Sequence, residues 1–160
     1  MLKDLIALEP DSRVWVYPAS REISYNELDA IRPVIHEFLE RWTAHNQSLV
    51  TYGNIFHQRF LCLFVDESVA GASGCSIDAS VHFIQELGNQ LNIDFFDRQQ
   101  VQFLIDDKVV SYALSEVKKM KDSGAIDENT LFFNNLVKTK KEFIDSWVVS
   151  VKDGWLRRFL

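Results

Sequence analysis

Residues 60–78, with the sequence Phe-Leu-Cys-Leu-Phe-Val-Asp-Glu-Ser-Val-Ala-Gly-Ala-Ser-Gly-Cys-Ser-Ile-Asp, decide how the chain is expected to fold. The unbroken apolar run from Phe60 to Val65 predicts a strand that is buried on both faces and therefore lies in the centre of a sheet. Two carboxylates end this strand, and a loop of small residues leads from it into a helix. We expect Ser76 or Asp78 to cap that helix.

The preceding residues supply elements that can pair with this strand or pack on it. Residues 13–17 predict a strand that ends at Pro18. Ser24 and Glu27 have the spacing of a capping box, which predicts the start of a helix. The expected buried stripe of this helix is Leu28, Ile31, Ile35, Phe38 and Trp42. Only three residues join residues 49–56 to the central strand, and this short connection predicts an antiparallel hairpin.

The remaining residues predict a second group of elements. Residues 101–105 and 108–112 flank two aspartates and predict a tight hairpin. A short helix from Ser115, a strand within residues 130–137 and a helix after Thr139 are expected to follow. The sequence therefore predicts an α+β fold. A β-α-β-β-α core with a mainly antiparallel sheet would occupy residues 1–95. A β-β-α-β extension with a C-terminal helix or tail would occupy residues 96–160, in the same domain or as a small second lobe.

The composition is that of one globular domain. The chain has 160 residues, of which 47% are hydrophobic, so it can bury a core. No apolar run approaches the roughly 20 residues of a membrane-spanning helix, and the N-terminus shows no pattern of a secretory signal. The two cysteines form no disulfide pattern, and we therefore expect a reducing, cytoplasmic location.

Charge is spread unevenly along the chain. The net charge is −6 overall, −9 over residues 1–117 and +3 over residues 118–160. The Lys and Arg residues of the last segment are sparser than the stripe that nucleic-acid binding usually requires, so we expect no nucleic-acid partner. The sequence leaves open whether this basic segment meets an acidic partner or simply provides solvated helix faces.

The end of the central strand has the form of one half of a nucleotide-hydrolysis site. In a Walker B strand, an Asp in the position of Asp66 steers Mg²⁺, and a Glu in the position of Glu67 orients the attacking water. The other half is missing, because the chain contains no Gly-x-x-x-x-Gly-Lys-Ser/Thr segment that could cradle phosphates. We therefore expect no ATP hydrolysis and predict no cofactor.

Four segments carry a resemblance to a known family: Ser12–Tyr17, Trp42–His45, Val69–Asp78 and Phe133–Val137. They resemble a family of small bacterial proteins that often carry the label "ABC transporter ATPase", and the resemblance extends over nearly the whole chain. It implies a family name and no established activity. The label does not fit the residues, because the phosphate-binding segment is absent.

Cys75 is the candidate nucleophile. A thiol at or just before a helix N-terminus is favoured in its thiolate form by the helix dipole and by nearby amides. Thiol catalysis also needs a base, and His45 and His57, which lie in or near loops, are the candidates. The alternative is that Cys75 is a small buried residue that packs the start of the helix.

The same loop has a composition that can hold an anion without any reaction. Glycines permit backbone turns that point amides at an anion, and a helix N-terminus adds a favourable dipole. The candidate ligand-binding residues are Gly71, Ser73, Gly74, Ser76 and Asp78. The alternative is a tight connection that simply requires small residues. The aspartates lack the spacing of a calcium loop and no His/Cys cluster occurs, so we predict no metal site.

Two functions remain open from the sequence. The first is a non-catalytic binding or interaction protein that uses the Ser/Gly loop at residues 71–78 for a small anion or a protein partner. The second is a small thiol-dependent enzyme with Cys75 as its nucleophile. The sequence identifies neither the ligand nor the oligomeric state.

Overall fold

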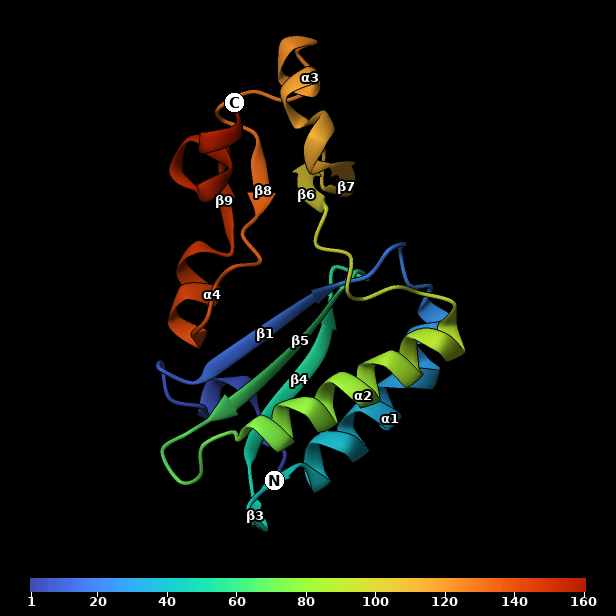
Figure 1. Ribbon diagram of the computed structural model, residues 1–160, viewed down its shortest axis with the longest axis vertical. Helices are drawn as coiled ribbons and strands as arrows, with labels where there is room; N and C mark the ends of the chain where they lie inside the picture. The colour runs from blue at the N-terminus through green and yellow to red at the C-terminus, as the bar shows by residue number, and fades with distance from the viewer.

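The computed structural model describes all 160 residues and shows two main sheets, one above the other along the long axis of the molecule (Figure 1). The N-terminal sheet contains β1 (Arg13–Pro18), β5 (Phe60–Asp66) and β4 (Val50–Phe56) in this order, and all neighbours are antiparallel. β5 lies in the centre and all seven of its residues are buried. The prediction of a central, fully buried strand is therefore confirmed.

Two helices cover one face of the N-terminal sheet (Figure 1). α1 (Tyr25–Arg41) begins with the predicted capping box, in which Ser24 and Glu27 each accept a hydrogen bond from the backbone N–H of the other. α2 (Gly74–Leu91) runs alongside α1. The apolar cluster between helices and sheet includes Leu28, Ile31, Ile35, Leu39, Leu61, Leu63, Val65, Ile84 and Leu87.

The opposite face of this sheet packs against the C-terminal third of the chain. Alternate side chains of β5 point to this side and contact α4 (Lys140–Ser146) and the end of β8 (Leu131–Phe133). The ring centroid of Phe60 lies 4.4 Å from that of Phe133 and 5.1 Å from that of Trp147. Residues from both predicted segments therefore share one buried cluster, while the boundary at residue 95 stays a prediction.

The second sheet has the strand order β7-β6-β8-β9, and all neighbours are antiparallel. Its other strands are β6 (Gln100–Ile105), β7 (Lys108–Ala113) and β9 (Val148–Ser150). β6 pairs with β8 through only two residue pairs, Phe103 with Phe132 and Leu104 with Leu131. The two strands separate beyond these pairs, and this separation positions the site described below.

Both predicted hairpins are present, and non-glycine residues form their turns. In the β4–β5 turn, His57 and Gln58 both have φ of 53°, and in the β6–β7 turn Asp106 and Asp107 have φ of 51° and 61°. Consecutive left-handed residues are what a type I′ turn requires. These turns match the twist of the strands without the Asn-Gly sequence that usually marks them.

The remaining elements are short. They are β2 (Thr43–Ala44), β3 (Gln47–Ser48), α3 (Val117–Asp122) and the 3₁₀ helices η1 (Leu5–Ala7), η2 (Leu114–Glu116), η3 (Val151–Asp153) and η4 (Trp155–Phe159). None of the helices has both the length and the apolar character that a membrane crossing needs.

The α+β fold class is confirmed, but several predicted details are wrong. The cap of α2 is Ser73, and not Ser76 or Asp78, because Ser73 and Ser76 form a reciprocal capping box. The strand predicted within residues 130–137 contains only Leu131–Phe133. In α1, Leu39 is fully buried, whereas Phe38 stacks at the edge of the core. β2, β3 and β9 have no counterpart in the prediction, since strands this short carry too little pattern.

Candidate functional site

The loop after β5 begins at Asp66, a buried carboxylate that holds two parts of the backbone together. Its Oδ1 accepts a hydrogen bond from the Ser68 N–H at 3.0 Å, and its Oδ2 accepts one from the Glu9 N–H at 3.1 Å. Burial alone raises the pKa of Asp66, but the hydrogen bonds it accepts and the charge of Lys3 outweigh burial and lower the pKa below its ordinary value. Asp66 therefore anchors the loop and the N-terminal segment.

Glu67 is also engaged within the loop. Its Oε2 accepts a hydrogen bond from the Ala72 N–H at 2.9 Å, and its Oε1 lies 3.8 Å from Arg13 Nε. A Cβ atom at Gly71 would lie only 3.1 Å from the same Oε2. The close approach of Glu67 thus explains part of the small-residue composition of this loop.

The start of α2 satisfies several of its own backbone donors. Ser73 Oγ accepts a hydrogen bond from the Ser76 N–H at 3.1 Å, and Ser76 Oγ accepts one from the Ser73 N–H at 2.7 Å. The N–H groups of Gly74 and Cys75 have no partner within the protein. Asp78 is an exposed residue inside the helix and not its cap. Anion binding at residues 71–78 stays a prediction, and it would depend on the two unpaired amides.

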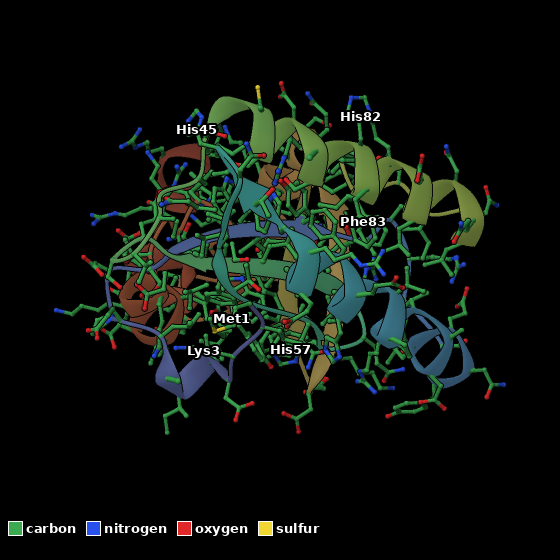
Figure 2. All side chains as sticks on the ribbon, turned by 90° about the horizontal axis from the view of Figure 1, so that it is seen from below. Met1, Lys3, His45, His57, His82 and Phe83 are labelled. Atoms are coloured by element: carbon green, nitrogen blue, oxygen red, sulfur yellow. The ribbon has the colours of Figure 1, made fainter.

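Cys75 is exposed, so the alternative that it is a buried packing residue is wrong. It is the second residue of α2, beside the unpaired amides. Figure 2 shows His45, from the turn between β2 and β3, beside the N-terminal end of α2. Trp42 Nε1 donates a hydrogen bond to the Ser76 carbonyl at 2.8 Å and ties these two segments together. His45 and Cys75 therefore come from neighbouring segments.

His57 lies far from Cys75. It is in the β4–β5 turn, whereas Cys75 follows the other end of β5, and a strand of seven residues spans roughly 20 Å. Figure 2 shows the labelled His45 and His57 well apart from each other. The ring centroid of His57 lies 5.1 Å from that of Phe133 and 5.7 Å from that of Trp147, and burial lowers the pKa of His57. The hypothesis that His57 is the base for Cys75 is therefore wrong.

A cavity of about 360 Å³ lies between the two sheets, where β6 and β8 separate. β6 lines one side, the segment that follows β8 lines another, and η4 and the end of β1 complete the lining. Its apolar residues are Pro18, Val101, Phe133, Leu136, Trp155 and Phe159, and its polar residues are Asp97, Arg98, Gln100, Gln102, Asn135 and Arg158. None of them belongs to a predicted site, because they come from widely separated stretches of the chain.

A chain of hydrogen bonds fixes the polar side of this cavity. Gln102 is only 2% exposed, and its Oε1 accepts a hydrogen bond from Asn135 Nδ2 at 3.0 Å. Asn135 Oδ1 in turn accepts one from Trp147 Nε1 at 2.9 Å. The Gln102 Nε2 group has no protein partner and is not among the fully enclosed atoms, and Gln102 lines both this cavity and a neighbouring one beside Ser20 and Asp94. This network therefore holds the free Nε2 donor of Gln102 in place.

Further donors line the same cavity. Arg98 Nη1 donates to the Val16 carbonyl at 3.1 Å, and its guanidinium lies 5.5 Å from the ring centroid of Tyr17, so β1 positions it. Arg158 is exposed and forms no ion pair. Trp155 Nε1 is buried without any acceptor. The cavity thus combines apolar rings with two arginine side chains that form no ion pair.

Neither a protein-family model nor a curated protein nor a solved structure matches this chain. The resemblance to the family labelled "ABC transporter ATPase" therefore stays a prediction. No group of three or more His, Cys, Asp and Glu side chains is placed to hold a metal ion.

Proposed function

We propose that this chain is a non-catalytic binding protein, and that a small, mainly apolar organic molecule occupies the cavity beside β6. The observation that carries the proposal is the cavity of about 360 Å³, whose lining joins aromatic and aliphatic side chains with a few fixed polar groups. Ligand pockets typically combine these features at volumes of roughly 300–1,000 Å³. The proposal keeps the binding function predicted from the sequence and moves its site away from the Ser/Gly loop.

A larger cavity of about 660 Å³, between the start of α1 and the tips of the two hairpins, supports ligand binding less well. Most of the residues that line it are polar, and its arginines are engaged within the protein. Arg59 Nε donates to the Ala19 carbonyl at 2.9 Å, and Arg32 Nε donates to Asn54 Oδ1 at 3.4 Å. These side chains serve the fold, which favours the cavity beside β6 as the site.

Phenylacetamide, a neutral compound with a single ring, is a direct probe of this cavity. In NMR titrations of the full chain, we expect saturable shifts at backbone amides of Val101, Leu136 and Phe159. Leu136→Trp should narrow the cavity and weaken binding at least about tenfold, which corresponds to about 1.4 kcal/mol. Ile144→Trp is the matched control, because Ile144 and Leu136 are both 63% exposed and Ile144 lies outside the cavity.

Two results would contradict the proposal. The first is an absence of saturable shifts in the wild type, and the second is an equal loss of binding in the two tryptophan variants.

ATP hydrolysis is not part of the proposed function, because the chain has no phosphate cradle and Asp66 is engaged by backbone N–H groups. We expect Mg-ATP to leave the melting temperature unchanged, and a saturable rise would count against this expectation.

A thiol-dependent enzyme is the second candidate function, and the exposure of Cys75 is the observation that favours it. His45 is the histidine whose position suits a base, since His57 is remote. The test is the rate at which iodoacetamide alkylates Cys75 across a range of pH. A rate that exceeds that of free cysteine and falls in His45→Asn would support the enzyme. A rate no higher than that of free cysteine would reject it.

A further inference from the structure

We infer that the ligand of the cavity beside β6 is a carboxylate with a small apolar body of about one ring, and this inference rests on the function proposed above. The lining offers positive charge, and its acceptors are largely engaged. A ligand that brings acceptors and negative charge complements both properties.

Two N–H donors of the lining lack an acceptor. The indole N–H of Trp155 is buried and unpartnered, although buried polar groups are nearly always hydrogen-bonded in folded proteins. The Gln102 Nε2 group is held at the cavity by the bond of 3.0 Å between Gln102 Oε1 and Asn135 Nδ2. Because Gln102 is 2% exposed, the protein interior and not solvent determines its position. A carboxylate oxygen would supply the acceptor that Gln102 Nε2 lacks, whereas Trp155 Nε1 is fully enclosed and out of reach of a ligand in the cavity.

The charged groups of the lining favour an anion. Arg98 and Arg158 both line the cavity, and neither forms an ion pair. Asp97 is the only acidic residue of the lining, and its Oδ1 already accepts a hydrogen bond from the Gln99 N–H at 2.8 Å. Guanidinium groups bind carboxylates through two parallel N–H···O bonds, which is why we choose a carboxylate among organic anions.

The apolar part of the lining defines the rest of the ligand. Phe159 is 48% exposed and Leu136 is 63% exposed, and both lie at the same cavity as the buried side chains of Val101 and Phe133. A ring placed between them would remove apolar surface of the ligand and of the protein from water. The volume of about 360 Å³ is near the lower end of ligand pockets, so a single ring with a short chain is the size expected.

The decisive comparison is phenylacetate against phenylacetamide, which share the ring and differ in charge. In NMR titrations of the full chain at neutral pH, phenylacetate should bind at least about tenfold more tightly, because it adds a charge-assisted hydrogen bond. The Trp155 indole N–H resonance, assigned with Trp155→Phe, should shift on binding, because Trp155 lines the cavity. Arg158→Gln should remove most of the preference for the acid. Arg157→Gln, an exposed neighbour outside this cavity, should keep it.

Gln102→Glu gives an independent test. Glutamate keeps an oxygen for Asn135 Nδ2 but replaces the free donor by a negative charge. This variant should lose phenylacetate binding and retain phenylacetamide binding, while Gln85→Glu, on the exposed side of α2, should retain both. The arginine variants change exposed residues, so they decide the question if Gln102→Glu fails to fold.

The outcomes separate this inference from the proposed function. Equal affinities of the wild type for phenylacetate and phenylacetamide would overturn the inference that the ligand is a carboxylate, and the cavity would remain a binding site. Equal losses in Arg158→Gln and Arg157→Gln would show a general effect of charge and would also overturn the inference. An absence of binding by both compounds would overturn the proposed function itself.

Discussion

The loop after β5 and the cavity beside β6 both contain polar side chains, but those of the loop are paired with the protein and several of those at the cavity are not. In the loop, both oxygens of Asp66 accept backbone hydrogen bonds, and the two capping serines of α2 bond each other. In the cavity, neither Arg98 nor Arg158 forms an ion pair. A loop whose side chains are paired within the protein maintains its own shape, whereas an arginine at a cavity that forms no ion pair is available to a ligand. Substitutions in the loop should therefore change stability, and substitutions in the cavity should change binding.

Asp66→Ala should cause the largest loss of stability in the loop, about 2–3 kcal/mol, because it leaves the N–H groups of Glu9 and Ser68 without their acceptor. The melting temperature, measured by circular dichroism at neutral pH, should fall by roughly 5–10 °C. Because the pKa of Asp66 is lowered in the folded protein, the contribution of its carboxylate to stability depends on pH. Its stabilisation should be complete above the unfolded pKa of about 4 and should be lost as the pH falls through the lower pKa of the folded protein.

Asp66→Asn is the matched variant, because asparagine keeps the size of the side chain and one acceptor oxygen. It should lose less stability than Asp66→Ala. Both variants, studied below their melting temperatures, should bind phenylacetate as the wild type does. If Asp66→Ala were as stable as the wild type at neutral pH, the contrast between the loop and the cavity would be contradicted, because the loop would then not depend on its internal hydrogen bonds.

The local features of the fold could be predicted, since each lies in one short stretch of sequence. The apolar run before Asp66 predicted the central strand β5, and the spacing of Ser24 and Glu27 predicted the capping box of α1. The cap of α2 was harder to predict, because several residues of this loop are good helix caps. Only the geometry of the loop selects Ser73 among them.

The cavity could not be predicted in the same way. It exists because β6 and β8 separate after two residue pairs, and no local pattern encodes that separation. In the sequence, Gln102 resembles any polar residue of a strand, and its role depends on Asn135, which follows 33 residues later. Cys75 was difficult to predict for a different reason. Its small neighbours are typical of a tightly packed junction, but the thiol is exposed.

Ser73→Ala should have a smaller effect than Asp66→Ala, a loss of about 1 kcal/mol in the free energy of unfolding. The change removes the oxygen that accepts the Ser76 N–H at 3.1 Å, while most of the packing of α2 remains. Urea denaturation measures the difference. Ser115→Ala is the control, because Ser115 is exposed and makes no capping hydrogen bond. Equal stabilities of the two variants would mean that the capping box of α2 contributes nothing measurable to the loop.

His57→Asn should have the smallest effect, and we expect it mainly as a change in the pH dependence of stability. Burial lowers the pKa of His57, whose ring packs against Phe133 and Trp147, so the folded protein favours the neutral ring. The stability contributed by the neutral ring is present above the unfolded pKa of about 6.5 and is lost as the pH falls through the lower folded pKa. Between about pH 7 and pH 5 the wild type should therefore lose more stability than the variant.

His45→Asn is the matched control for this measurement. Both histidines occupy left-handed turn positions, with φ of 51° at His45 and 53° at His57, and asparagine tolerates this conformation. Denaturant unfolding at several pH values gives the dependence of the free energy of unfolding on pH. If this dependence became equally weak in His57→Asn and His45→Asn, the assignment to His57 would be contradicted. Arg59 and Lys108 line the polar cavity beside His57, so the series should be repeated at high salt. A dependence of stability on pH that survives added salt identifies burial as the cause, because salt would screen the influence of these two charges.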